Sequence, residues 1–161
     1  MSDFQEPVPD ILSAAKRHNM IPQNGTVLTA VSGGADSIAM LHSLYLLSKE
    51  QHFTLHCCHV NHMLRDITAD RDEAFVLSFC RKLSIPCHIK RVNVKELLKE
   101  SSGIEETARI ARYKALEEVA KEISADCIAV AHNSDDVAET LLFNLIRGTG
   151  IDGMGSIRPV K

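Results

Sequence analysis

The 161-residue chain contains no C-x-x-C pair, and its five cysteines are an odd number. Both facts argue against a disulfide framework and against a zinc site. Most of these cysteines stand in apolar segments, where a free thiol behaves as a small hydrophobic side chain. We therefore expect a cytoplasmic protein in which all five cysteines are reduced: Cys57, Cys58, Cys80, Cys87 and Cys127.

The sequence also lacks a charged N-terminal region followed by an apolar stretch, and no run approaches eighteen apolar residues. We therefore expect a protein that is neither exported nor membrane-spanning. Eighteen basic and twenty-one acidic residues give a net charge of −3, which argues against a nucleic-acid-binding surface over the whole chain. Residues 81–100 hold six basic and two acidic residues, a run that a solvated helix face explains at least as well as an RNA contact does.

Apolar runs of strand length alternate with segments of helical periodicity along the chain. We expect strands at residues 27–31, 53–60, 87–92 and 127–131, and helices at 9–19, 36–49, 67–83, 93–100, 104–122 and 135–146. This alternation predicts an α/β fold, a parallel, doubly wound, Rossmann-like sheet flanked by helices. With 45% hydrophobic residues the chain can bury one core, so we expect residues 1–23 to be a lead-in helix and linker and 24–161 to form one domain.

The helical periodicity also predicts which side chains face the core. The expected core positions are Ile38, Leu41, Tyr45 and Leu46 in the first helix of the sheet, Ala74, Val76, Leu77, Phe79 and Cys80 in the next, and Ala108, Ala115, Leu116, Val119 and Ile123 in the helix at 104–122.

The segment that follows the first strand has the composition of a phosphate-binding loop, Ser32-Gly33-Gly34-Ala35-Asp36-Ser37. Adjacent glycines let the backbone turn sharply and bring N–H groups against an anion, and the serines add hydroxyl donors. The next helix would present its positive end to the loop. A Walker A lysine and the G-x-G-x-x-G spacing are both absent. Asp36 would repel phosphate unless Mg²⁺ bridges the two, and the alternative is a tight turn in which Asp36 is the helix N-cap.

Two more polar segments follow predicted strands, His59–Arg65 after the second and His132–Asp136 after the fourth. The carboxyl ends of parallel strands meet at one edge of the sheet, so we expect all three segments to contribute to one site. His59 and His62 have a spacing that suggests a metal, but two histidines alone do not make a zinc site, so zinc is not expected here. A loop that orders around ATP or substrate fits better, and His56 is expected to be structural.

The S-G-G-x-D-S pattern resembles the PP-loop ATP pyrophosphatases, which cleave ATP between its α and β phosphates and activate a substrate as an adenylate. Three further segments make the resemblance narrower: residues 58–65 (CHVNHMLR), 106–113 (ETARIARY) and 131–140 (AHNSDDVAET), the last followed by Arg147-Gly148-Thr149-Gly150. In this order, from about residue 24 to the end, they are similar to the catalytic domain of the tRNA(Ile)-lysidine synthetases. The chain departs from that family's pattern at Asn133 and Val137.

The resemblance implies roles for individual residues. Asp36 and Asp136 would hold Mg²⁺ and orient the target, and Arg112 would lie against the adenylate with Arg109 in support. The alternative for Arg109 is a surface salt bridge, with Glu105 four positions earlier. The ATP-binding set implied by the resemblance is Ser32, Gly33, Gly34, Ala35, Asp36, Ser37, His59, Asn61, His62, Arg109, His132, Arg147 and Gly148.

The function implied by the resemblance is a carbon–nitrogen ligase that uses ATP to join L-lysine to carbon 2 of the wobble cytidine in tRNA(Ile) with a CAU anticodon. It would release pyrophosphate and AMP, and a homodimer is compatible with it. The alternatives are a tRNA thiolation enzyme of the same fold and an adenine-nucleotide-binding module without catalysis. Members of the family continue beyond the Gly-rich segment near residue 150, so we expect a chain truncated at its C-terminal end.

Overall fold

The computed structural model describes residues 21, 24–63, 66–98 and 103–131. Within them lies one four-stranded sheet in the order β3-β2-β1-β4, and every pairing is parallel. The strands are β1 (Thr26–Ala30), β2 (Thr54–Asn61), β3 (Cys87–Arg91) and β4 (Cys127–Val130). The parallel α/β sheet predicted from the sequence is confirmed, with strand ends that differ from the prediction by one residue.

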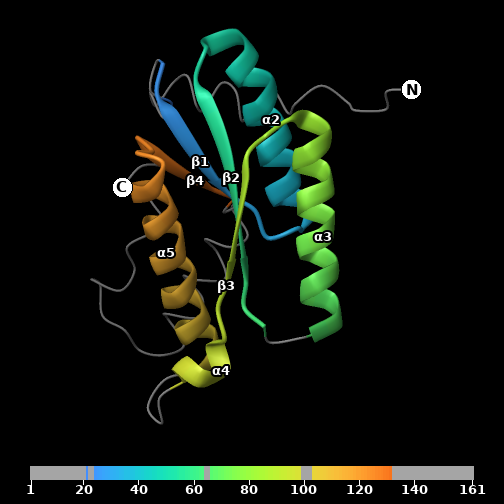
Figure 1. The fold of residues 1–161 in the computed structure, drawn as a ribbon, viewed down its shortest axis with the longest axis vertical. Helices are drawn as coiled ribbons and strands as arrows, with labels where there is room; N and C mark the ends of the chain where they lie inside the picture. Colours follow the sequence, from blue (N-terminus) through green and yellow to red (C-terminus); the bar gives the residue numbers. More distant parts are fainter. Residues whose placement is uncertain (1–20, 22–23, 64–65, 99–102, 132–161) are drawn as a thin grey trace, which may run out of the picture. The chain divides into compact units, whose positions relative to one another are not determined.

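Helices cover both faces of this sheet, as Figure 1 shows. Helices α2 (Ala35–Gln51) and α3 (Asp66–Leu83) lie on one face, and α5 (Ile104–Glu122) lies on the other. The short α4 (Val94–Leu97) joins β3 to α5 and is half the length predicted for it. The predicted helices at 9–19 and 135–146 lie outside the described residues.

The chain divides into two compact units, Met1–Val130 and Ala131–Lys161, and all of these strands and helices belong to the first. The predicted domain boundaries at residues 23 and 24 stay a prediction.

The two faces of the sheet carry separate hydrophobic clusters because successive strand residues point to opposite sides. Toward α2 and α3 the cluster includes Val27, Leu55 and Val76, and toward α5 it includes Leu28 and Leu116. Since both faces are covered, the strands are almost continuously apolar. Each fully buried Leu or Val stabilises the fold by about 1.5–3 kcal/mol relative to an exposed one.

Three details of the predicted core were wrong. In α2 the buried leucines are Leu41, Leu44 and Leu47, whereas Leu46 is only partly buried. The reason is that α2 is apolar on most of its circumference, so its pattern does not define one face. Tyr45 packs against the core cluster as predicted. In α5 Ala111 is buried and Ala108 only partly, and in α3 Ala74 is exposed.

The acidic side chain of Glu73, one position before Ala74, is only 7% exposed. Apolar periodicity cannot indicate a buried carboxylate.

Three of the five cysteines meet in the core between α3 and the sheet. The sulfur atoms of Cys57, Cys80 and Cys87 all lie within 4.8 Å of one another. Hydrogen bonds with the Cys80 and Cys87 thiols raise the pKa of Cys57, and hydrogen bonds from Cys57 and Cys80 lower the pKa of Cys87. Spacing along the sequence gave no sign of this group, because its members come from three different elements.

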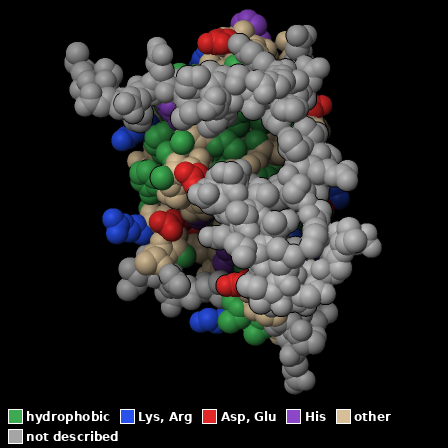
Figure 2. Space-filling model, turned by 180° about the vertical axis from the view of Figure 1, so that it is seen from behind, with side chains coloured by type: hydrophobic (Ala, Val, Ile, Leu, Met, Phe, Trp, Pro, Cys, Tyr) green, Lys and Arg blue, Asp and Glu red, His purple; other side chains and the backbone are tan. Residues whose placement is uncertain are grey.

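The surface of the described residues is mixed. Seen from behind, hydrophobic side chains gather in one area, and lysine, arginine and carboxylate side chains lie toward its borders (Figure 2). Across the described part of the chain, no helix combines the length and hydropathy needed to cross a bilayer. The large hydrophobic side chains that are exposed are Met63, Phe75, Leu97, Leu98, Ile104 and Ile110.

Candidate functional site at the carboxyl edge of the sheet

The turn between β1 and α2 depends on one of its two glycines. Gly33 has φ +99°, and a Cβ at this position would stand 3.1 Å from the Cβ of Asp72. A side chain there would strain the backbone and press against α3. Gly34 has φ −72°, and a Cβ there would meet only the Ser32 hydroxyl, at 3.5 Å. The fold therefore requires glycine at 33, and position 34 offers open space at the loop surface.

The hydroxyl group of Ser37 closes this loop from inside. It donates a hydrogen bond to the Gly34 carbonyl (2.8 Å), accepts one from the Ser32 N–H (3.2 Å) and lies 3.1 Å from the Ser32 hydroxyl. Ser37 is 5% exposed, whereas Ser32 is exposed. Of the two serines predicted as donors, Ser37 shapes the loop and Ser32 lies at its surface.

The first turn of α2 begins directly at the loop. Gly34 is the N-cap, so no side chain caps this end of the helix. Ala35 and Asp36 are both exposed. The N–H groups of a first helical turn lack intrahelical partners and carry the positive end of the helix dipole. Asp36 is the second helical residue, so the alternative in which it is the N-cap was wrong. Its carboxylate supplies oxygen atoms of the kind that Mg²⁺ prefers.

At the end of the neighbouring strand, His59 is bound from one side only. Its Nδ1 donates a hydrogen bond to the Val31 carbonyl at 2.8 Å. In a neutral imidazole this leaves Nε2 as an acceptor. The residue is 3% exposed, and Nε2 has no hydrogen-bond partner within the described part of the chain. The ring is thus held by the backbone, and its second nitrogen is buried without a partner among the described residues.

Two more buried polar atoms near His59 are unpartnered among the described residues, Nδ1 of His62 and Nε of Arg112. Burial lowers the pKa of His62, and the charges of Arg112 and then His59 lower it further, which also shows that these groups are close. His62 is therefore neutral at pH 7. An unsatisfied buried polar group costs about 1–3 kcal/mol, so three of them at one edge indicate a place where a ligand or water binds.

The two arginines of α5, Arg109 and Arg112, stand three residues apart but differ in exposure and in partners. Arg109 makes a two-pronged ion pair with Glu106 (2.9 Å for each contact) and is exposed. The surface salt bridge considered for Arg109 thus exists, but the expected partner Glu105 was wrong. Arg112 is half-buried, and its guanidinium lies 5.4 Å from the centre of the Tyr113 ring. Arg112 is the arginine that reaches the buried group.

Asn61, the last residue of β2, is bound within the protein on all sides. Its amide donates to Glu73 (3.0 Å) and, with a long contact, to Asp70 (3.4 Å), and its oxygen accepts from the Met63 N–H (2.9 Å). Arg91 donates to both carboxylate oxygens of Glu73 (2.6 and 3.0 Å). These contacts hold the segment that carries His62.

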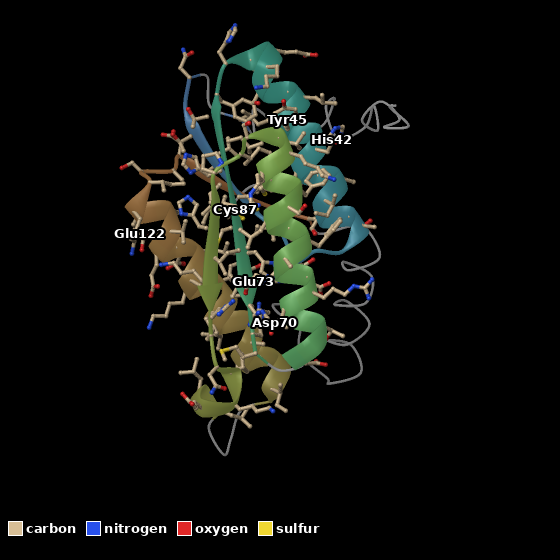
Figure 3. All side chains as sticks on the ribbon, turned by 45° about the vertical axis from the view of Figure 1, so that its right-hand side comes forward. His42, Tyr45, Asp70, Glu73, Cys87 and Glu122 are labelled. Atoms are coloured by element: carbon tan, nitrogen blue, oxygen red, sulfur yellow. The ribbon has the colours of Figure 1, made fainter. Side chains whose placement is uncertain are left out.

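In Figure 3 Glu73 and Asp70 lie on the side of α3 that faces the sheet. The hydrogen bonds from Arg91 lower the pKa of Glu73 against the opposing effect of burial. Sequence reasoning assigned Asn61 to nucleotide and missed Glu73 and Arg91. The one feature of the sequence that points to Glu73 is that its carboxylate stands within the apolar stripe of α3.

His56, expected to be structural, stacks on His88 with a contact of 3.0 Å between Nδ1 and Nε2. The remaining predicted site residues lie outside the described residues: Arg65, His132, Asp136, Arg147 and Gly148. Their contribution to the site stays a prediction.

Comparison with known proteins identifies the family of this chain. Residues 9–161 match a protein family described as a PP-loop domain. The chain belongs to that family. It is 42% identical over 155 residues to a protein of Clostridium acetobutylicum named tRNA(Ile)-lysidine synthase, covering 96% of this chain and 34% of the relative. It is 44% identical over 143 residues to the protein of the same name from Chlorobaculum tepidum, covering 88% of this chain and 43% of the relative.

Among solved structures, the PP-loop chain resembles the U34-tRNA thiolase NcsA from Methanococcus maripaludis with its [4Fe-4S] cluster. The TM-score is 0.73 at 25% identity, and the match covers 87% of this chain and 51% of that one. The predicted α/β fold and the predicted membership of the PP-loop family are both confirmed. The chain spans about a third of the length of the first two curated relatives, 34% and 32%.

Proposed function

We propose that this chain carries the ATP-dependent activation step of lysidine formation, in which L-lysine is joined to carbon 2 of the wobble cytidine of tRNA(Ile) with a CAU anticodon. Two relatives above 40% identity that bear the lysidine synthase name support this substrate class. The observation that carries the proposal is a group of buried atoms on His59, His62 and Arg112 that have no hydrogen-bond partner among the described residues. They lie beside a loop that presents a helix N-terminus.

The chemistry has two steps. The cytidine oxygen at carbon 2 attacks the α phosphorus of ATP, and the bond to the β phosphate breaks with loss of pyrophosphate. The lysine ε-amine then attacks carbon 2, and the oxygen leaves with AMP while the amine loses a proton. Little covalent chemistry is asked of the protein in such transfers, so positioning and charge stabilisation dominate.

The described residues fit these tasks. The loop around Gly34 and the first turn of α2 would receive the phosphates. Arg112 is the cation of the buried group, since His62 is neutral, and it would bind the α phosphate as negative charge develops. His59 Nε2 would accept a hydrogen bond from a hydroxyl or amino group of the nucleotide. Asp36 would supply carboxylate oxygens to a bound Mg²⁺, whose charge would stabilise the departing pyrophosphate. The resemblance adds Asp136 to this role, and that residue lies outside the described residues.

The test is release of pyrophosphate from ATP by the purified chain, with and without a tRNA(Ile) transcript and lysine. We expect release that depends on the tRNA and falls at least tenfold in Asp36→Asn. Glu50→Gln is the matched control, because Glu50 is an exposed carboxylate near the other end of the same helix. Full activity in Asp36→Asn would contradict the role given to Asp36. ATP binding without tRNA-dependent turnover would favour the nucleotide-binding module.

A thiolation enzyme is the second candidate, favoured by the structural similarity to the tRNA thiolase. Against it, the described cysteines lie within strands and α3, where three of them are fully buried. Replacing lysine by a sulfide donor in the same assay separates the two functions. Sulfur in the tRNA product, in place of lysine, would decide for thiolation.

A further inference from the structure

His62 lies in a short turn at the end of β2, between Asn61 and Met63. The Asn61 amide donates a hydrogen bond to Glu73 on α3 at 3.0 Å, and the Asn61 oxygen accepts one from the Met63 N–H at 2.9 Å. Asn61 and Glu73 are 3% and 7% exposed, so water competes little for the bond between them. One buried side chain therefore links the residue after His62 to α3.

The backbone of the same turn is bound to the chain that follows β3. The N–H of Val92 donates to the Asn61 carbonyl at 2.8 Å, and the N–H of Val94, the first residue of α4, donates to the His62 carbonyl at 3.4 Å. Val94 is fully buried, so this second anchor is fixed in the core. The turn is thus held from α3 through a side chain and from the chain after β3 through its backbone.

Met63 has a backbone conformation that its side chain disfavours. Its φ is +53°, in the left-handed region that residues other than glycine seldom adopt. The Met63 side chain is 43% exposed, so its burial does not account for the conformation. The conformation does bring the Met63 N–H to the Asn61 oxygen. Backbone strain of this kind persists where the surrounding contacts impose it, and it is frequent beside functional groups.

The group carried by this turn is the His62 ring. Its Nδ1 is buried without a hydrogen-bond partner among the described residues, so no such bond at this atom fixes the direction of the ring. The ring lies close enough to Arg112 for the guanidinium charge to lower the pKa of His62 further, after burial. The turn therefore determines where the ring lies relative to Arg112 before any ligand binds.

We propose that Asn61 is a positioning residue for the ATP-dependent activation step, a role that rests on the function proposed above. In this role Asn61 does not touch the nucleotide. Its side chain, bound to Glu73 and to the Met63 N–H, holds His62 so that the ring and Arg112 meet the same substrate group. Polar groups that are already in place need no reorganisation in the transition state, so loosening the turn should slow the reaction more than it weakens ATP binding.

The first experiment compares two substitutions that introduce similar backbone strain at different places. Met63→Val and Ser84→Val each put a β-branched side chain at a left-handed position, with φ +53° and +56°. Ser84 follows the far end of α3 and is exposed. Both variants should lose thermal stability.

The rate of tRNA-dependent pyrophosphate release at saturating ATP, measured below the unfolding temperature of each variant, distinguishes the two. It should fall about tenfold in Met63→Val, with the KM for ATP within about threefold of wild type, and stay at the wild-type value in Ser84→Val. A wild-type rate in Met63→Val, or an equal loss of rate in Ser84→Val, would overturn the proposal.

The second experiment exchanges the donor and the acceptor between β2 and α3. Asn61→Asp removes the hydrogen bond to Glu73 and sets two carboxylates together, although its oxygen can still accept from the Met63 N–H. We expect the rate to fall about tenfold. The double variant Asn61→Asp with Glu73→Gln restores one donor and one acceptor with the shape and net charge of the wild type, and it should recover most of the rate. Absence of any recovery would refute the role of this hydrogen bond.

Nitrogen NMR of the His62 ring in the ligand-free chain separates this proposal from the proposed function. The ring resonances should shift in Asn61→Asp and in Met63→Val, and stay in place in Ser84→Val. Unchanged resonances in the first two variants would contradict the positioning role. A wild type without tRNA-dependent release would refute the proposed function, whereas the ring resonances would still show whether Asn61 and Met63 place His62.

Discussion

Two polar groups lie around the end of β2, one centred on the buried Glu73 and one on the buried His59, and they differ in whether the described residues satisfy their hydrogen bonds. Around Glu73, the Asn61 amide and the Arg91 guanidinium donate to the Glu73 carboxylate, and the Asn61 oxygen accepts from the Met63 N–H. Around His59, atoms of His62 and Arg112 are buried without partners among the described residues. The group around Glu73, called here the satisfied group, holds the end of β2 in place. The group of His59, His62 and Arg112, called the unsatisfied group, leaves polar atoms that a ligand can bind.

The largest effect on stability is expected from removing the centre of the satisfied group. Glu73→Ala removes the main acceptor of the buried Asn61 amide, which should lower the free energy of unfolding by about 1–3 kcal/mol. Arg91 adds little to this loss, because its side chain is 61% exposed and can be hydrated. Urea unfolding followed by circular dichroism measures it. Asp70→Ala is the control one turn earlier on α3, since its contact with Asn61 is long and it is exposed. Equal losses in both variants would refute the central place of Glu73.

Substitutions at the two loop glycines are expected to have different effects, one on stability and the other on ATP binding. Gly33→Ala should lower the free energy of unfolding by about 1–3 kcal/mol, because the positive φ and the contact with Asp72 leave no room for a side chain. Gly34→Ala should keep wild-type stability and lose ATP affinity, since its methyl group would stand at the loop surface. Thermal unfolding and ATP titration are the two readouts. Wild-type ATP affinity in Gly34→Ala would argue against phosphate at this loop.

The two arginines of α5 test the unsatisfied group itself. Arg112→Gln should change stability by less than about 1 kcal/mol, because no hydrogen bond at Nε is lost, and should lower the rate of pyrophosphate release at least tenfold. Arg109→Gln should stay within about twofold of wild type in that rate, since an exposed ion pair contributes little. If Arg109→Gln is the more damaging change, the assignment to Arg112 is wrong.

The smallest effect is a pH dependence of stability. The pKa of His62 is lowered in the folded protein, chiefly by burial and next by Arg112, and burial also lowers that of His56. Near pH 6.5, the ordinary pKa of histidine, the unfolded chain therefore binds more protons than the folded protein. The contribution of these two histidines to the free energy of unfolding is therefore fully present above that pH and is lost as the pH falls through it. His62→Phe should flatten the decline between about pH 7.5 and 5.5. An unchanged slope in that variant would assign the decline to other groups.

These contrasts also show what the sequence could predict. The bounds of α5 coincide with the predicted 104–122, because Gly103 and a clear three- and four-residue apolar spacing mark it. The loop after β1 and the edge shared by His59 and His62 followed from strand order, since parallel strands end together.

The remainder depended on three-dimensional packing. Nothing local separates Gly33 from Gly34, or Arg109 from Arg112, until the position of α3 and the direction of α5 are known. The buried Glu73 was missed for the same reason, as its partners come from β2 and β3. The cysteine group was missed because strand register, and not sequence spacing, brings its members together.

Ligand binding by the unsatisfied group is tested most directly by nitrogen NMR of the histidine rings during titration with ATP and Mg²⁺. We expect the resonances of His59 Nε2 and His62 Nδ1 to shift as nucleotide binds, with the paired rings of His56 and His88 as an internal reference that stays unchanged. ATP binding that leaves the resonances of His59 and His62 in place would contradict the role of this group.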